Sequence, residues 1–195
     1  MSTFGYFTQD ITGDDRRAVI EFLTGIESDW KLAEGVRMGE LFPPTVALAL
    51  SPDYGDLLTD FIDNTEELVI ASARASNEMK TFGLDDEAVE YLPFQLLDKK
   101  KRPMKQSYCV ANPLVLVPCL DTKRSAFECF PGSKEIISTS VSRILLKEDE
   151  IPATASFFRI AELPSRIVFR SDLVERLAAA GCTGLPVRKT GEPVT

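Results

Sequence analysis

The sequence predicts an α+β fold: a mostly antiparallel sheet with a C-terminal amphipathic helix, preceded by a smaller mixed α/β part. Strand-like segments follow one another over residues 89–169 without regular helices between them, whereas a doubly wound fold alternates the two. Residues 1–85 instead mix short apolar runs with helix-like segments. We therefore expect an acidic N-terminal α/β subdomain over residues 1–85 and an α+β domain, built on a long β-hairpin, over residues 86–195.

The first elements expected are short. Residues 3–11 (TFGYFTQDI) have the aromatic content of a strand. Residues 16–23 space their apolar side chains as a short helix does. Residues 30–44 contain two glycines and a proline pair, which predict a loop, and residues 46–50 form an apolar run that predicts a buried strand.

Residues 51–63 carry a helix-start pattern, with serine as the cap, proline at the first helical position and an acid in the first turn. Such a helix places its leucines on one face and Asp56, Asp60 and Asp63 on another. Like charges at this spacing repel each other and do not stabilise the helix. The acidic face is therefore either a merely solvated face or a docking surface for a basic partner.

Trp30 is the only tryptophan, and it lies in a glycine-bearing segment near several acids. A tryptophan in a loop is a good interface anchor, and the alternative is a core residue that covers the N-terminal strand. The candidate partner-binding residues are Asp53, Asp56, Asp60, Asp63, Glu66, Glu67 and Trp30.

The middle of the chain predicts one strand, one helix and a hairpin. Residues 68–71 are expected to form a short strand or to enter the helix that follows over residues 72–82, which a glycine ends. Residues 89–97 and 107–120 are strand-like and are joined by the basic turn 98–105, which predicts a long antiparallel hairpin. The four consecutive cations of this turn, residues 99–102, suit a solvated tip that discourages edge pairing, or a contact with a phosphate or an acidic partner.

The last third predicts further strands and a helix. Shorter strands are expected near residues 126–130, 135–138, 157–160 and 166–169. An amphipathic helix then begins at Ser171 and stops at Gly181.

The composition narrows the chemistry. The 195 residues include no histidine, which excludes Ser-His-Asp and Cys-His catalysis and every metal site built on imidazole. There is no phosphate-binding glycine loop and no dinucleotide-binding glycine pattern, so we expect no cofactor. Carboxylate pairs are abundant, but no spacing singles out two with opposed pKa shifts. Asp121 and Ser125 fit a turn that bonds its own backbone better than they fit a nucleophile site.

The charge is unevenly distributed. The net charge is −8; residues 1–90 carry 19 acidic and six basic residues, whereas residues 91–195 carry 11 acidic and 16 basic ones. The acidic segment suits a basic partner and argues against nucleic acid as the main ligand. The chain begins without a signal-peptide pattern and contains no apolar run long enough to span a bilayer, so we expect a cytoplasmic location and no membrane. The four cysteines are expected to be core or strand thiols.

Several short segments occur in an order that resembles the eleventh immunity-protein family of bacterial polymorphic toxin systems, formerly a domain of unknown function. The segments are VEYLP from Val89, YCVANPL from Tyr108, Leu120–Asp121 with Ser125–Phe127, FFRI from Phe157, LPS from Leu163, and Ser171–Leu173 leading to GCTGL from Gly181. The resemblance covers roughly residues 68–187.

This resemblance implies a non-enzymatic cytoplasmic protein that binds and neutralises a cognate toxin encoded nearby. It provides no catalytic residues, and it suggests that Asn112, Pro113, Asp121 and Ser125 determine the fold. Two alternatives stay open: a regulatory or scaffolding partner in a bacterial signalling or developmental pathway, and a carboxylate-dependent enzyme. A homodimer is compatible with the strand edges of the second half.

Overall fold

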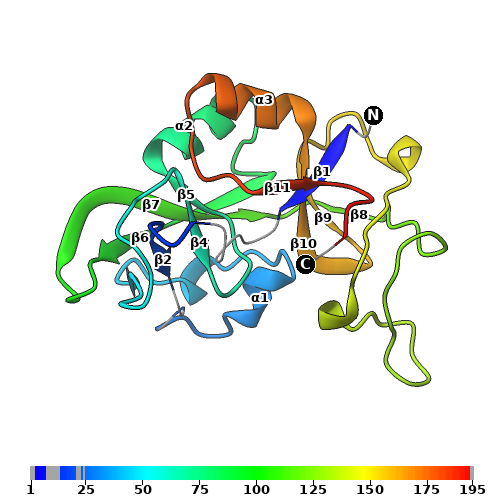
Figure 1. Cartoon of the computed structure of the whole chain (residues 1–195), viewed down its shortest axis with the longest axis horizontal. Coiled ribbons are helices and arrows are strands. Elements are labelled where there is room, and N and C mark those ends of the chain that lie inside the picture. Colours follow the sequence, from blue (N-terminus) through cyan, green and yellow to red (C-terminus); the bar gives the residue numbers. More distant parts are fainter. Residues whose placement is uncertain (1–2, 8–13, 21–22, 24, 194–195) are drawn as a thin grey trace.

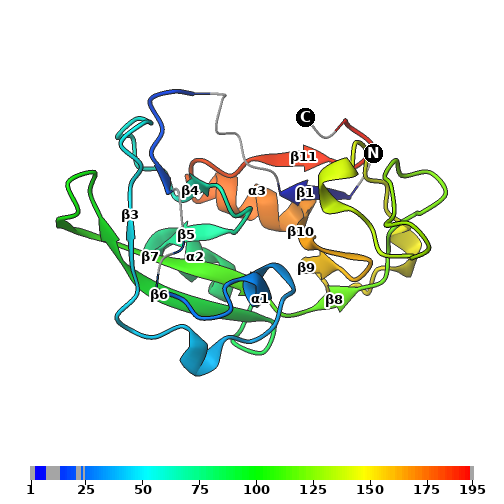
Figure 2. The ribbon, with the colours of Figure 1, turned by 90° about the horizontal axis from the view of Figure 1, so that it is seen from below.

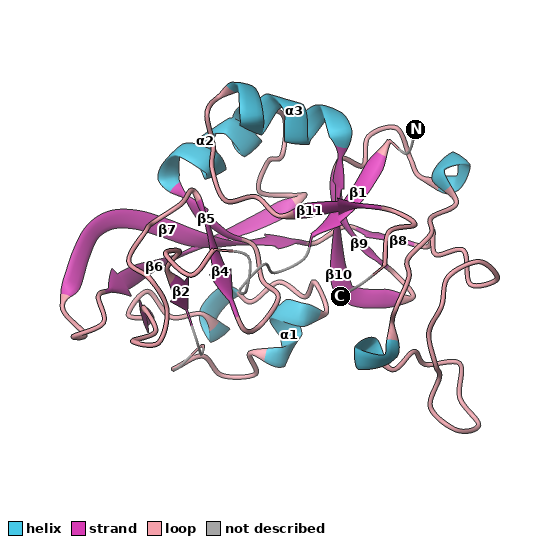
Figure 3. Ribbon diagram, in the orientation of Figure 1, coloured by secondary structure: helices cyan, strands magenta, loops and turns pink. Residues whose placement is uncertain are grey.

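The computed structural model describes residues 3–7, 14–20, 23 and 25–193. Figures 1 and 3 show two β-sheets side by side, with two helices packed next to each other across them. The strands are β1 (Phe4–Phe7), β2 (Val19–Ile20), β3 (Ala47–Ala49), β4 (Phe61–Asn64), β5 (Ile70–Ser72), β6 (Val89–Leu97), β7 (Pro103–Pro113), β8 (Leu116–Val117), β9 (Phe157–Ile160), β10 (Leu163–Arg170) and β11 (Val187–Lys189). The α-helices are α1 (Trp30–Ala33), α2 (Ala73–Thr81) and α3 (Ser171–Ala179).

The β6–β7 hairpin is the centre of a six-stranded sheet with the order β2-β4-β5-β7-β6-β3. Its register runs from the pair Val89–Pro113 to the pair Leu97–Pro103, so the predicted hairpin is confirmed. The second strand, predicted over residues 107–120, instead ends at Pro113, and residues 116–117 (β8) pair in the other sheet. At its tip, the Asp98 side chain accepts hydrogen bonds from the backbone N–H groups of Lys100 and Arg102 (2.8 and 2.9 Å). The basic turn is therefore closed by its own aspartate.

The second sheet has five strands in the order β11-β1-β10-β9-β8. Its pairs are antiparallel apart from β8 with β9. Parallel pairs also join β2 to β4 and β3 to β6, in the part formed by the N-terminal segment. The predicted α+β class is confirmed. Both sheets combine strands from either side of residue 85, and the division into domains 1–85 and 86–195 stays a prediction.

Helices α2 and α3 lie side by side and cover one face of both sheets (Figure 1). Ser72 caps α2, because its hydroxyl accepts a hydrogen bond from the Ala75 N–H (3.1 Å). Met79 and Leu177 are buried in a core shared by the two helices and the sheets. Both helices are followed by a glycine with positive φ, Gly83 or Gly181, as the sequence predicts.

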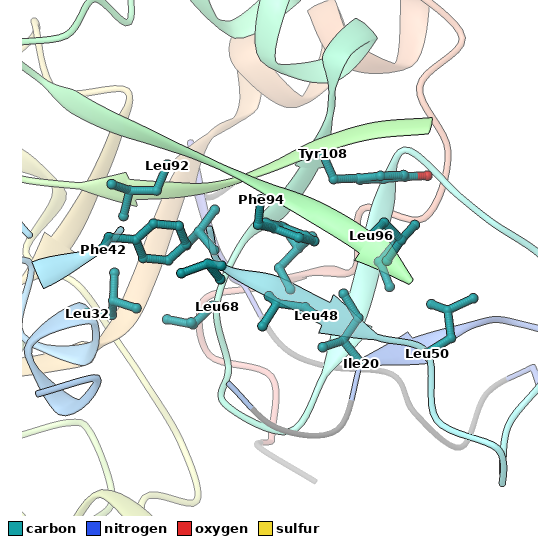
Figure 4. Close-up of a cluster of buried hydrophobic side chains, with 14 of the residues drawn as sticks. Ile20, Leu32, Phe42, Leu48, Leu50, Leu68, Leu92, Phe94, Leu96 and Tyr108 are labelled. Atoms are coloured by element: carbon teal, nitrogen blue, oxygen red, sulfur yellow. The ribbon is translucent and has the colours of Figure 1, made fainter. Parts of the chain in front are cut away.

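The opposite face of the six-stranded sheet packs against the N-terminal segment. Figure 4 shows this core, in which Ile20, Leu32 and Leu48 from β2, α1 and β3 meet Phe94 and Leu96 of the hairpin. A third core lies between the five-stranded sheet and residues 117–155. In that segment the strands predicted over 126–130 and 135–138 are reduced to isolated bridges. The three cores lie on both faces of both sheets.

The structure corrects several predicted elements. Residues 16–23 do not form a helix where they are described: Val19 and Ile20 form strand β2. Residues 51–60 are turns and irregular backbone, and residues 61–64 form β4, so the predicted acidic helix is wrong. The segment 30–44 holds α1 and a 3-10 turn at Gly39–Leu41 rather than a plain loop. Residues 8–11 of the first predicted strand lie outside the described residues.

The physical reason for the missing helix is burial on two sides. Phe61 packs into the core beneath α2 and α3, whereas Ile62 packs into the core on the other face of the sheet. Strands alternate their side chains between two faces, so only an extended backbone satisfies both contacts. Within the described residues, no helix is both long and apolar enough to cross a bilayer.

Candidate partner-binding surface

Asp60 was predicted as a partner-binding residue, and the structure buries it between three elements. Its carboxylate pairs with Arg74 of α2 and accepts hydrogen bonds from the Ser72 hydroxyl (2.7 Å) and from the N–H and hydroxyl of Thr183 (2.9 and 3.1 Å). Burial alone raises the pKa of Asp60, but the hydrogen bonds from these partners outweigh it and hold the pKa well below its usual range. Asp60 therefore joins β4 to α2 and to the segment after α3.

Asp63 and Glu67 also have partners within the chain. Asp63 is 1% exposed and pairs with Arg17 (2.9 Å). Glu67 is partly exposed and pairs with the buried guanidinium of Arg166. The acids of the predicted acidic face therefore fall into two groups. Asp60 and Asp63 are buried and paired with arginines of the chain, so they are not exposed to a partner.

The other predicted acids lie on the surface. Asp53, Asp56 and Glu66 are exposed. Asp56 is close to Lys99 of the hairpin turn (3.2 Å), and both side chains remain accessible. Exposed pairs of this kind contribute little to stability, so these acids are available to interact with another molecule.

Trp30 begins α1 and is 58% exposed, which excludes the core alternative. The Asp29 side chain accepts a hydrogen bond from the Trp30 N–H (2.8 Å) and so fixes the start of the helix. The Lys31 ammonium lies 5.7 Å from the centroid of the indole ring. An indole that is held at the surface in this way is an exposed aromatic anchor.

Trp30 forms one wall of a groove of about 700 Å³ between α1, strand β8 and the segment 130–139. In the view of Figure 2, α1 lies between β6 and β8. Three further large apolar side chains are exposed in this groove: Val36 (41%), Leu116 (43%) and Phe130 (47%). Exposed apolar side chains that gather at one concave surface mark binding sites more often than scattered ones do.

Acidic side chains border the groove. Glu34, Glu135 and Glu162 line it, and none of the three forms an ion pair with any residue that the structure describes. Glu162 accepts one hydrogen bond, from the Leu120 N–H (3.3 Å). The groove therefore combines an apolar centre with a negatively charged border.

Arg159 fixes the floor of the groove. It is 1% exposed and donates hydrogen bonds to the carbonyl oxygens of Leu32 (2.6 Å), Ala33 (3.2 Å), Pro113 (3.2 Å) and Pro164 (2.7 Å). Burial lowers the pKa of Arg159 to about 10, so the guanidinium remains charged at neutral pH. One side chain thus ties α1 to the hairpin and to β10.

Asn112 and Glu90 extend this buried network. Asn112 accepts a hydrogen bond from Arg159 (3.3 Å) and donates to the Val36 carbonyl (3.0 Å) and to Glu90 (3.4 Å). The Glu90 carboxylate also binds the N–H groups of Met38 and Gly39 (2.8 and 3.0 Å). The network holds the whole segment that follows Trp30.

Gly35 lies directly over this network. Its φ is +69°, and a Cβ atom at this position would lie 2.8 Å from the Arg159 Cδ and 2.9 Å from the Pro113 carbonyl oxygen. A side chain at residue 35 would therefore displace α1 from its support.

Sequence reasoning found Trp30 but missed the groove. Its apolar and acidic residues come from four segments that are far apart in the chain, and none of them has a pattern that separates it from ordinary surface. The available signal was in the motifs that carry the family resemblance, because FFRI contains Arg159 and YCVANPL contains Asn112.

The candidate turn that contains Asp121 and Ser125 has a structural role. The Asp121 carboxylate accepts hydrogen bonds from the N–H groups of Lys123 and Arg124, and Ser125 bonds the backbone of Leu145, so the predicted self-bonded turn is confirmed. Within the described residues, no group of three or more His, Cys, Asp or Glu side chains is arranged to hold a metal ion.

The comparisons with known proteins point to one family. No curated protein matches the chain. A family model described as "Immunity protein family (Imm11)" matches residues 15–192, which extends the resemblance of residues 68–187 to nearly the whole chain. The chain belongs to the Imm11 immunity protein family.

Proposed function

We propose that this protein is an immunity protein that neutralises a cognate bacterial toxin by binding it directly, without catalysis. The observation that carries the proposal is the family match over residues 15–192. The exposed apolar groove beside Trp30 supports it, because apolar side chains surrounded by polar ones are typical of protein interfaces. The protein acts in the cytoplasm in this proposal, where it meets the toxin as it enters or as it is made.

The buried acids support a binding role over a carboxylate-dependent enzyme. Asp60, Asp63 and Glu90 each bind an arginine or backbone N–H groups within the chain. Such carboxylates are fixed by structural partners, whereas a general base needs access to a substrate proton. The exposed predicted residues Trp30, Asp53, Asp56 and Glu66 are the part of the predicted set that a partner can reach.

Titration of the toxin tests the proposal. The toxin domain encoded beside the gene is purified, and its remaining activity is measured as this protein is added. Direct binding predicts that activity falls in proportion to the added protein and reaches zero near one equivalent, with a complex that co-elutes in gel filtration. Complete inactivation by far less than one equivalent would instead indicate catalysis. No loss of toxicity and no complex would favour the regulatory alternative.

A further inference from the structure

We propose that the groove beside Trp30 binds an exposed segment of the toxin that presents an apolar side chain flanked by lysine or arginine. This inference rests on the proposed function and adds to it the location of the interface and the chemistry of the bound segment. Three independent features of the groove carry it: its apolar side chains, its three carboxylates that form no ion pair with a described residue, and its rigid floor.

The apolar centre specifies what enters the groove. Trp30 and Phe130 line the groove with about half of their surface accessible, together with Leu116 of β8 and Val36, which follows α1. A volume of about 700 Å³ accommodates several side chains of a partner. Aromatic residues around such a centre contribute most of the binding energy of protein interfaces when they are covered.

The carboxylates specify the charge of the partner. Glu34, Glu135 and Glu162 line the groove, and no lysine or arginine is among the described residues that line it. An acidic segment or a phosphate would therefore meet three carboxylates, with Lys31 beside the indole and the buried Arg159 as nearby cations. A lysine or arginine beside the apolar anchor would instead find a carboxylate within reach. A second copy of this chain would bring the same three carboxylates toward each other, which disfavours self-association through this surface.

A smaller hollow shares Trp30 and Ala33 with the groove. It has a volume of about 140 Å³, is lined by Leu23, Leu68 and Ala33, and is bordered by Asp29 and Glu66. Trp30 therefore lines two hollows that both include acidic side chains. A bound segment that spans both hollows would cover the exposed part of the indole.

The floor is already in place before a partner binds. Arg159 and Asn112 hold the backbone of α1 and the segment after it through hydrogen bonds to carbonyl oxygens. A surface that is ordered in advance loses little conformational entropy on binding, which favours high affinity.

The single tryptophan permits a direct test. This protein is labelled with 5-fluorotryptophan, so that its fluorine spectrum reports Trp30 alone, and the unlabelled toxin domain is added. We expect the resonance to shift in proportion to the complex formed and to saturate at one equivalent. In calorimetry, Trp30→Ala and Phe130→Ala should each weaken binding by about 30-fold or more.

A matched control separates the groove from surface hydrophobicity in general. Leu57 is 48% exposed but does not line the groove, so Leu57→Ala should bind the toxin within about twofold of the wild type. Circular dichroism and urea unfolding check that each variant is folded, and Trp30→Phe, which keeps an aromatic ring, should recover part of the affinity.

The outcomes distinguish the two proposals. If the wild type neither binds nor neutralises the toxin, both proposals fail. If the wild type binds at one equivalent while the Trp30 resonance is unchanged and both groove variants bind normally, the groove proposal fails and the proposed function stands. A resonance that shifts with the concentration of this protein alone identifies a second copy as the occupant and also overturns the inference.

Discussion

Two regions of this molecule place carboxylate side chains in opposite environments. At the junction of β4, α2 and the segment after α3, Asp60 and Asp63 are buried, and each pairs with an arginine of the chain. Around the groove, Glu34, Glu135 and Glu162 are accessible, and no described cation pairs with them. The first set stabilises the fold because its charge is compensated internally. The second set has no ion-pair partner among the described residues, so its charge faces solvent.

The largest effect is expected at Arg159, on which the groove depends structurally. Arg159→Met removes hydrogen bonds to four carbonyl oxygens and leaves them buried, so the free energy of unfolding should fall by about 3–5 kcal/mol. Urea unfolding measures this loss. Arg159→Lys should lose less, because an ammonium keeps the charge but has fewer donors in a different geometry.

Arg143→Met is the matched control for this prediction. Arg143 is exposed, and its side chain donates to the Arg124 carbonyl (3.0 Å). Its replacement should change stability by about 0.5 kcal/mol or less. Equal stability of the Arg159 and Arg143 variants would show that the buried network does not support the groove.

Asp60 should give the next largest effect and a characteristic pH dependence. Asp60→Asn should cost about 2 kcal/mol at pH 7, a value reduced from that of a fully buried pair because Arg74 is half exposed. The folded-state pKa of Asp60 is lowered, so the carboxylate stabilises the fold fully above its unfolded pKa of about 4, and this contribution is lost as the pH falls below it.

Thermal or urea unfolding between pH 7 and pH 3 checks this sign. The difference in stability between the wild type and Asp60→Asn should shrink as the pH falls through 4. Asp53→Asn, which changes an exposed acid of the same segment, should leave the pH profile of the wild type nearly unchanged. A gap between wild type and Asp60→Asn that stays constant down to pH 3 would contradict the assigned role of the charge.

The smallest effects on stability, and the sharpest test of the comparison, are expected at the groove acids. Replacing Glu34, Glu135 and Glu162 together by glutamine should change stability by less than about 1 kcal/mol but slow association with the toxin about tenfold at low salt. Asp53→Asn combined with Asp56→Asn removes two exposed acids outside the groove and should slow association by about threefold or less. Stopped-flow measurements of the association rate at several salt concentrations compare the two variants. Equal slowing by both would show that the groove acids are no more important for association than other exposed acids.

The sequence predicted those parts of the fold whose signals are local. The hairpin followed from two strand-like runs joined by a polar turn, α2 from its terminal glycine, and α3 from its apolar spacing and its terminal glycine. The helix expected over residues 51–63 failed because its apparent cap and its apolar spacing were outweighed by distant contacts: Arg17 and Arg74 hold its acids, and Gly55 lies against the backbone of Arg16.

The site was predictable only in part. Trp30 was identified because it is the only tryptophan of the sequence and lies near several acidic residues. Phe130 and Leu116 were not, because their surroundings follow no period, and they meet Trp30 only through the packing of the two sheets. Asp60 and Asp53 look alike in sequence, since burial depends on residues more than 100 positions away, such as Thr183.

The pairing of strand β1 with strands from the far end of the chain affects when the five-stranded sheet can form during synthesis. It is paired on both of its edges, with β10 and with β11, and the 155 residues from 8 to 162 separate it from the first of these partners. At a synthesis rate of about 5–20 residues per second, β1 leaves the ribosome roughly 10–30 s before β10 is complete. During that interval Phe4, Tyr6 and Phe7 lack their native neighbours. A chain that is still being synthesised therefore lacks the five-stranded sheet, and only a finished molecule can present the fold described above.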